Sequence, residues 1–238
     1  MRELELTRGG AILRASETGD GPTVLLLHAG GERRTVWEPV ARALDQGGVR
    51  SVAFDQRGHG DSSGEPTSLA MLADDVRAMT RQQRRPVTIV GASIGGLAAL
   101  DALADPATAL RTRGLVLVDV VPDPDPVRVR AWLDEQGLRR RRGALVDDVL
   151  ARGPTLRATL ATLDLPILLV RGGTGSPISD ADIARLRETN PRVRVEQVDE
   201  AGHLVARDAP ERLAAIILES TATWHHDQRS SSCGGSVR

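Results

Sequence analysis

Gly91-Ala92-Ser93-Ile94-Gly95-Gly96 is the stretch of sequence that decides the fold. It follows an apolar run at residues 86–91 that predicts a buried strand, and it opens a segment at residues 93–104 that predicts a helix. The glycines let the backbone turn sharply between the two elements, which would present the Ser93 hydroxyl at the carboxyl end of the strand. A glycine-rich turn of another α/β fold is the alternative. The strand and helix on either side favour a nucleophilic serine.

Outward from this turn, short β-rich runs alternate with longer helical patterns. This alternation is typical of a mostly parallel sheet with crossover helices, preceded here by an antiparallel pair turned at Gly9-Gly10. Strands are expected at residues 3–7, 11–16, 24–28, 51–55, 86–91, 115–119, 167–171 and 193–198, and helices at residues 35–44, 69–79, 93–104, 179–188 and 209–219.

Two segments interrupt this rhythm. Residues 122–163 are about forty residues with a helical pattern, whereas a connection between parallel strands needs only about a dozen. We therefore expect an inserted cap over the carboxyl ends of the strands. Within it, the four arginines at 139–142 predict a solvated helical face rather than an anion site. Residues 221–238 are rich in Ser, Gly and His and predict a disordered tail, which leaves one domain at residues 1–220.

Composition narrows the function. The chain has 238 residues, 40% hydrophobic and 26% charged, with a net charge of −1, which argues against a nucleic-acid partner. It has no apolar run of membrane-spanning length and no signal peptide, so we expect a cytoplasmic protein that does not bind membranes. The single cysteine, Cys233, excludes an internal disulfide and a cysteine-based zinc site. Without lysine, the chain cannot form a lysine Schiff base, and we expect neither a cofactor nor a metal.

A second small-residue loop, His28-Ala29-Gly30-Gly31, follows the strand expected at residues 24–28. Backbone N–H groups in such a loop can approach a developing oxyanion. The Gly30 N–H would pair there with that of Ile94, the residue after the nucleophile. We expect His28 itself to be structural.

Together these stretches resemble the α/β-hydrolase family, including its serine esterases and cofactor-free chloroperoxidases. The markers are His28 to Gly31, Asp55-Gln56-Arg57-Gly58-His59-Gly60-Asp61-Ser62, Gly91 to Gly96, and Gly202-His203, in family order over nearly all of residues 1–220. The resemblance implies a mostly parallel, doubly wound α/β sheet of the α/β-hydrolase type with a short helical cap. It also implies that His203 is the general base and that the segment at residues 55–62 is structural. Ala29 stands where glycine is commoner, His59 lies in a structural motif, and His225 and His226 fall in the predicted tail.

The third member of the catalytic triad is where the sequence departs from the family. Ser176 stands where the family commonly places an aspartate, and the nearby Asp180 and Asp182 are expected to cap the next helix. Some relatives carry the acid after the strand that follows the nucleophile helix, which would be Asp119 here. Asp199 and Glu200 precede His203 too closely for the required geometry. Asp119 as the acid, another carboxylate as the acid, and a triad without an acid all remain open.

The resemblance thus implies a serine hydrolase that acts on a small or medium ester, lactone or thioester by an acyl-enzyme mechanism. Ser93 excludes the branches of the fold that need a carboxylate nucleophile. The alternative is a hydrolase-fold protein with an impaired triad, acting as a binding protein or as a non-hydrolytic lyase, and Ser176 is the feature that favours it. The expected partner is a small-molecule substrate. The sequence makes no prediction of oligomeric state.

Overall fold

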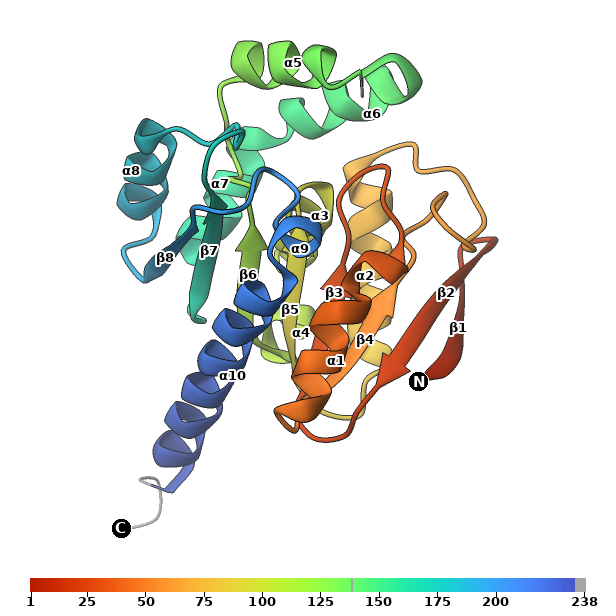
Figure 1. Cartoon of the computed structure of the whole chain (residues 1–238), viewed down its shortest axis with the longest axis vertical. Coiled ribbons are helices and arrows are strands. Elements are labelled where there is room, and N and C mark those ends of the chain that lie inside the picture. Colours follow the sequence, from red (N-terminus) through yellow and green to blue (C-terminus); the bar gives the residue numbers. More distant parts are fainter. Residues whose placement is uncertain (138, 234–238) are drawn as a thin grey trace.

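The computed structural model describes residues 1–137 and 139–233, and of residues 139–142 and 225–233 only the backbone. Its centre is an eight-stranded sheet with the strand order β1-β2-β4-β3-β5-β6-β7-β8 (Figure 1). The first pair and the β2–β4 pair are antiparallel, and all other neighbours are parallel. The strands are β1 (Arg2–Arg8), β2 (Ala11–Thr18), β3 (Thr23–Leu27), β4 (Arg50–Phe54), β5 (Val87–Ala92), β6 (Thr112–Val118), β7 (Ile167–Gly172) and β8 (Val193–Val198). The predicted fold class and its eight strands are confirmed.

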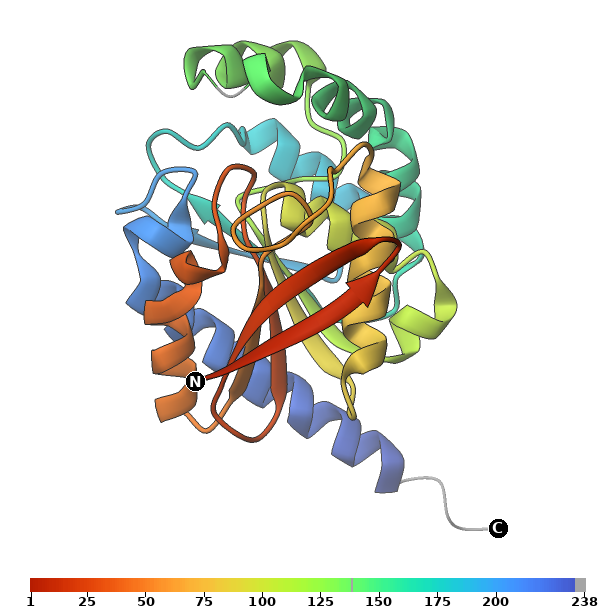
Figure 2. The same cartoon turned by 90° about the vertical axis from the view of Figure 1, so that its right-hand side faces the viewer.

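Helices cover both faces of the sheet (Figures 1 and 2). One face carries α1 and α10, and the other carries α2, α3 and α7. The helices are η1 (a 3-10 turn, Arg34–Trp37), α1 (Glu38–Gln46), α2 (Leu69–Gln82), α3 (Ile94–Ala102), α4 (Pro106–Leu110), α5 (Pro126–Glu135), α6 (Arg139–Ala151), α7 (Gly153–Thr162), α8 (Asp180–Thr189), α9 (Val205–Asp208) and α10 (Pro210–Cys233).

Alternate residues of the central strands enter two separate cores. In β3, Leu25 and Leu27 pack with α2 and α3, while Val24 and Leu26 pack with α1 and α10. A parallel strand that is buried on both faces has few polar positions. This is why the strands are recognisable as short apolar runs, and why the polar chemistry collects in the loops at their ends.

The predicted cap at residues 122–163 divides into two parts. Helices α5 and α6 lie above the end of the sheet where the parallel strands finish (Figure 1). Helix α7 instead belongs to the domain core, where Leu156 and Leu160 are fully buried beside α3. The side chains of the arginine run at 139–142 lie outside the described residues, so its solvated face stays a prediction.

The C-terminal helix is longer than predicted. Helix α10 continues past the expected end at Glu219 to Cys233, and Thr221 and Trp224 are buried. The prediction that the domain stops at residue 220 is therefore wrong, because the Trp224 indole packs against Gly114 of β6. The tail prediction for residues 234–238 falls outside the described residues.

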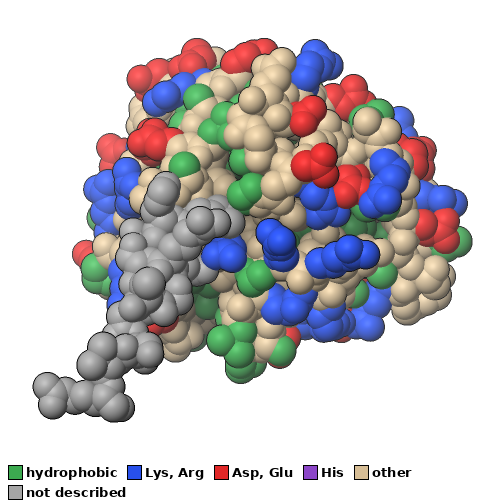
Figure 3. All heavy atoms as spheres, turned by 90° about the horizontal axis from the view of Figure 1, so that it is seen from below, with side chains coloured by type: hydrophobic (Ala, Val, Ile, Leu, Met, Phe, Trp, Pro, Cys, Tyr) green, Lys and Arg blue, Asp and Glu red, His purple; other side chains and the backbone are tan. Residues whose placement is uncertain are grey.

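Among the described residues, every helix is too short or too polar to serve as a membrane span. The end of the molecule opposite α5 and α6 displays both arginine and acidic side chains (Figure 3). That face is therefore not of a single charge.

Candidate active site

Ser93 lies on a sharp turn between β5 and α3. Its backbone has φ 49° and ψ −121°, a left-handed conformation that costs a residue with a side chain about 1–3 kcal/mol. Small neighbours make the turn possible: a Cβ on Gly91 would lie 2.5 Å from Gly96 Cα, and one on Gly95 would lie 2.7 Å from the Leu27 carbonyl oxygen. The Ser93 hydroxyl is half-buried and makes no hydrogen bond to the helix that it precedes. It is thus held at the carboxyl end of the strand, as the sequence predicts.

His203 lies in the loop between β8 and α9, and its partner is Asp119. The imidazole Nδ1 is 2.8 Å from Asp119 Oδ2, with the His203 side chain 11% exposed and the Asp119 side chain 0% exposed. Because an ionised carboxylate can only accept a hydrogen bond, Nδ1 carries the proton and Nε2 is left as the basic nitrogen. Of the alternatives left open by the sequence, the geometry favours Asp119 as the orienting acid.

Asp119 follows β6 directly, beside the turn that carries Ser93. The Ser93 N–H donates to the carbonyl oxygen of Val118 at 3.1 Å, and the Asp119 N–H donates to that of Val170 at 2.8 Å. Like Ser93, Asp119 has a φ of 49°. Ser93 and Asp119 therefore stand at the ends of two adjacent strands.

Ser176 has a role that sequence reasoning missed. Its hydroxyl donates to Asp119 Oδ1 at 2.7 Å and accepts the Ile178 N–H at 3.1 Å. The Gly172 N–H donates to the same Asp119 oxygen at 2.8 Å. Both carboxylate oxygens of Asp119 thus accept hydrogen bonds, and Ser176, which stands where the family commonly places an aspartate, helps to hold the carboxylate that contacts His203. The spacing in the sequence carries no signal for this contact, since it joins loops 57 residues apart.

The other nearby acids are occupied elsewhere. Asp182 caps the start of α8, as predicted, in a capping box with Ser179, whereas Asp180 pairs with Arg171 at 2.6 Å. Burial alone would raise the pKa of Asp182, but hydrogen bonds from Ser179 and Arg128 hold that pKa below its usual range. Asp199 and Glu200 are exposed, and Asp199 accepts a hydrogen bond from Gln197.

The predicted oxyanion loop lies beside the nucleophile turn. A Cβ on Gly30 would lie 3.7 Å from Ile94 Cγ2, so the loop lies within contact distance of the Ile94 side chain. The Ala29 N–H donates to Glu32 Oε2 at 3.2 Å, and the Glu32 N–H donates to the Ala29 carbonyl at 3.1 Å. Burial raises the pKa of the Glu32 carboxyl. These bonds fix the loop, and the Gly30 N–H as an oxyanion donor stays a prediction.

His28 holds this loop in place. The Gln56 N–H donates to His28 Nε2 at 3.0 Å, so Nδ1 carries the proton and donates to the Ala29 carbonyl at 2.8 Å. The ring is fully buried. Both contacts suit the structural role that we expect for His28. His59 is also buried, with Nδ1 3.0 Å from the Arg57 carbonyl oxygen.

The segment at residues 55–62 is held by one buried carboxylate. Asp55 accepts the N–H groups of Arg34 at 2.6 Å and Asp61 at 2.8 Å, and it pairs with the Arg34 guanidinium. A Cβ on Gly60 would lie 2.1 Å from Asp55 Oδ2, so glycine is needed there. These bonds agree with the structural role that the resemblance implies.

Helix α5 contributes a second residue that sequence reasoning missed. The rings of Trp132 and His203 meet edge to face, with centroids 4.6 Å apart and planes at 69°. One turn earlier on α5, Arg128 donates to the Pro177 carbonyl oxygen at 3.2 Å and pairs with Asp182. The helix is therefore attached to the loop of Ser176 and covers the imidazole. Helical periodicity could suggest the inner face of α5, but not what it covers.

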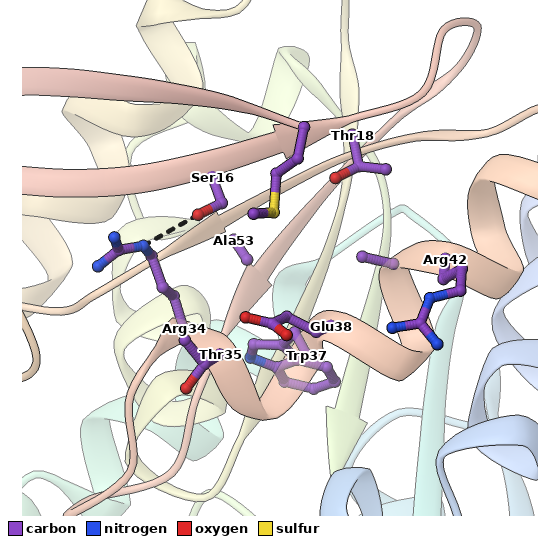
Figure 4. A pocket seen from close by; sticks show the side chains of 10 residues that line it. Ser16, Thr18, Arg34, Thr35, Trp37, Glu38, Arg42 and Ala53 are labelled. Carbon is purple, nitrogen blue, oxygen red and sulfur yellow. Dashed lines mark hydrogen bonds between the residues drawn. The ribbon is translucent and has the colours of Figure 1, made fainter.

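A cavity of about 210 Å³ lies elsewhere, between β2 and the start of α1 (Figure 4). Ser16 accepts a hydrogen bond from Arg34 at its edge, at 3.0 Å. Its lining does not include Ser93, Asp119 or His203. We therefore assign it no part in the chemistry.

Comparison with known proteins agrees with this geometry. A sequence model of the alpha/beta hydrolase family matches residues 24–216. The chain is similar to an esterase of Mycobacterium tuberculosis, with 27% identity over 266 residues that cover 90% of this chain and 88% of the relative. It is also similar to the 2-(acetamidomethylene)succinate hydrolase of Mesorhizobium japonicum, with 26% identity over 250 residues that cover 85% and 89%. Among solved structures, an esterase of Thermogutta terrifontis has the same fold, with a TM-score of 0.75 at 21% identity over 94% of this chain and 100% of that one.

Proposed function

The chain belongs to the alpha/beta hydrolase family, and from that premise we propose that it is a serine hydrolase that cleaves a small or medium ester, lactone or thioester. The observation that carries this proposal is the hydrogen bond from His203 Nδ1 to Asp119 Oδ2, at the same end of the sheet as the strained Ser93 turn. The two full-length relatives described above, an esterase and a hydrolase, also support it.

In the proposed acylation step, His203 Nε2 takes the Ser93 hydroxyl proton while the serine oxygen adds to the substrate carbonyl carbon. The carbonyl electron pair moves onto oxygen, which accepts hydrogen bonds from the Gly30 and Ile94 N–H groups. When the tetrahedral intermediate collapses, the bond to the leaving group breaks and His203 gives its proton to that group. Asp119 keeps the imidazole in the required tautomer and stabilises its positive charge.

Water completes the cycle in the proposed deacylation step. His203 takes a proton from a water molecule while the water oxygen adds to the acyl carbon. Collapse of the second intermediate then breaks the bond to Ser93, which recovers its proton from His203. The products are a carboxylic acid and the free alcohol or thiol, and for a lactone the acid and the alcohol belong to one hydroxy acid.

The alternative, a binding protein or lyase with an impaired triad, depended on Ser176 in place of the family acid. The bond between Asp119 and His203 weighs against that alternative, because it supplies an acid from another strand.

A fluorophosphonate probe, which phosphonylates activated serines, tests the proposal. We expect labelling of the wild-type protein at Ser93, none in Ser93→Ala, and strongly reduced labelling in His203→Ala. The same variants should lose hydrolysis of p-nitrophenyl acetate. A folded wild-type protein that takes up no label would support the binding-protein alternative and refute the proposal.

A further inference from the structure

Helix α5 has an apolar face that the described residues bury only in part. Val129, Trp132 and Leu133 lie on one side of the helix and are half-buried. Within the described chain, no residue of α5 is fully buried. On the opposite side, Val127 is 76% exposed. The inner face is therefore turned toward the domain without being packed into its core.

This helix is held at one defined place. Arg128 bonds the Pro177 carbonyl oxygen and the buried Asp182 carboxylate, and Trp132 lies one helical turn further along the same side. The tether brings the indole against the His203 imidazole, with ring centroids 4.6 Å apart.

Trp132 is also exceptional among the large aromatic residues. The chain has three tryptophans, one phenylalanine and no tyrosine, and the structure describes all four. Trp37, Phe54 and Trp224 are buried in the two cores, and only Trp132 stays outside them. The protein thus places its one aromatic side chain outside the core beside the proposed catalytic base.

The position of Trp132 relates it to one part of the substrate. In the proposed reaction, His203 hands a proton to the leaving oxygen or sulfur, so the leaving group must lie next to the imidazole. A group bound there meets the indole, whereas the acyl chain extends from the carbonyl carbon held at Ser93. We propose that Trp132 is a specificity-determining residue that selects esters and thioesters with a flat, apolar leaving group, above all an aryl group. This inference rests on the proposed function.

Two ester series separate the leaving group from the acyl group. One series keeps the acetyl group and varies the leaving group, with phenyl acetate compared with ethyl acetate. The other keeps p-nitrophenol and lengthens the acyl chain from acetyl to hexanoyl. The enzymes are wild type, Trp132→Ala, Trp132→Phe and the matched control Val127→Ala, which changes the outer side of the same helix. For each substrate, kcat/KM of the variant is divided by kcat/KM of the wild type. The intrinsic reactivity of the leaving group cancels in this ratio, because both values refer to the same substrate.

We expect Trp132→Ala to lower kcat/KM for phenyl acetate about tenfold more than for ethyl acetate, since one aromatic contact is worth roughly that factor. Trp132→Phe should retain most of the preference, and Val127→Ala should leave it unchanged. In the acyl series, Trp132→Ala should lower kcat/KM by a similar factor for every substrate. An equal loss for phenyl and ethyl acetate, no loss, or a change in acyl-chain preference would each overturn the inference. The variant Ser93→Ala separates failure of this inference from failure of the proposed function. If one of those outcomes is found and Ser93→Ala is inactive, the inference fails and the proposed function stands. If Ser93→Ala still hydrolyses these esters, the proposed function fails as well.

Discussion

At the residue scale, two strained residues define the proposed catalytic centre. Ser93 and Asp119 end adjacent strands, and both have a φ of 49°. Such a conformation in a residue with a side chain persists only where the surrounding structure enforces it. In Ser93 it lies at the turn from β5 into α3, and in Asp119 it accompanies a carboxylate that contacts His203. A positive φ is thus common to the proposed nucleophile and the proposed acid.

The first prediction concerns the acid. Asp119→Asn should lower kcat by about 10³–10⁴, because an amide no longer enforces the tautomer in which His203 Nε2 is basic. Asp180→Asn is the matched control, since Asp180 lies near the usual family position and its side chain is 93% exposed. Steady-state hydrolysis of p-nitrophenyl acetate checks both variants. Unchanged turnover in Asp119→Asn would remove Asp119 from the mechanism.

The second prediction concerns Ser176 as a positioning residue. Ser176→Ala removes one hydrogen bond to Asp119, and should lower kcat about tenfold while KM stays the same. Ser176→Thr retains the hydroxyl and should recover most of the lost rate. A purely structural role would predict loss of thermal stability without recovery of kcat in the threonine variant, so melting temperatures are measured alongside.

At the element scale, the sequence predicts some features well and others poorly for physical reasons. The strands are predictable because burial on both faces leaves them apolar. The Ser93 turn is predictable because glycines at positions 91, 95 and 96, between a strand and a helix, indicate a tight turn with no room for larger side chains. The division of residues 122–163 between α5, α6 and α7 is not predictable, since a helical pattern does not say whether a helix covers the sheet edge or packs on its face. The contact between Ser176 and Asp119 joins two distant loops and has no periodic signature.

The third prediction concerns the attachment of α5 to α8 through Asp182. A carboxyl whose pKa is lowered by folding stabilises the folded state above its unfolded pKa of about 3.9, and this contribution is lost as pH falls through the folded pKa. Asp182→Asn should therefore lower the free energy of unfolding by about 2 kcal/mol at pH 7. The deficit should shrink below about pH 4. Urea unfolding at both pH values measures it, with Asp147→Asn, an acid paired to Arg130 on the cap surface, as the control. A deficit that is the same at all pH values would contradict the assignment.

At the scale of the whole molecule, the C-terminal helix covers the core on the face of the sheet that also carries α1. Residues 217, 221 and 224 lie on one side of α10 and are buried, although the sequence from Ser220 onward is polar and rich in Ser and Thr. That composition is why the sequence predicts the helix only as far as residue 219 and misses its extension to Cys233. The feature that fixes it is tertiary: a Cβ on Gly114 would lie 2.2 Å from Trp224 Cε3, so glycine in β6 provides the space that the indole fills.

The fourth prediction follows from this contact. Trp224→Ala should lower the free energy of unfolding by about 3–5 kcal/mol, because a large buried side chain leaves a cavity that the structure fills only in part. Gly114→Ala should also destabilise the protein, since the added methyl displaces the indole. Leu110→Ala removes an apolar side chain that is 84% exposed and should change stability by less than about 0.5 kcal/mol. Urea unfolding midpoints test whether residues beyond 220 stabilise the domain. Equal midpoints for wild type and Trp224→Ala would mean that they contribute nothing to it.

The loops that carry Ser93, Asp119 and His203 lie at the other end of the sheet. A folded Trp224→Ala protein should therefore keep the wild-type kcat at temperatures well below its melting point.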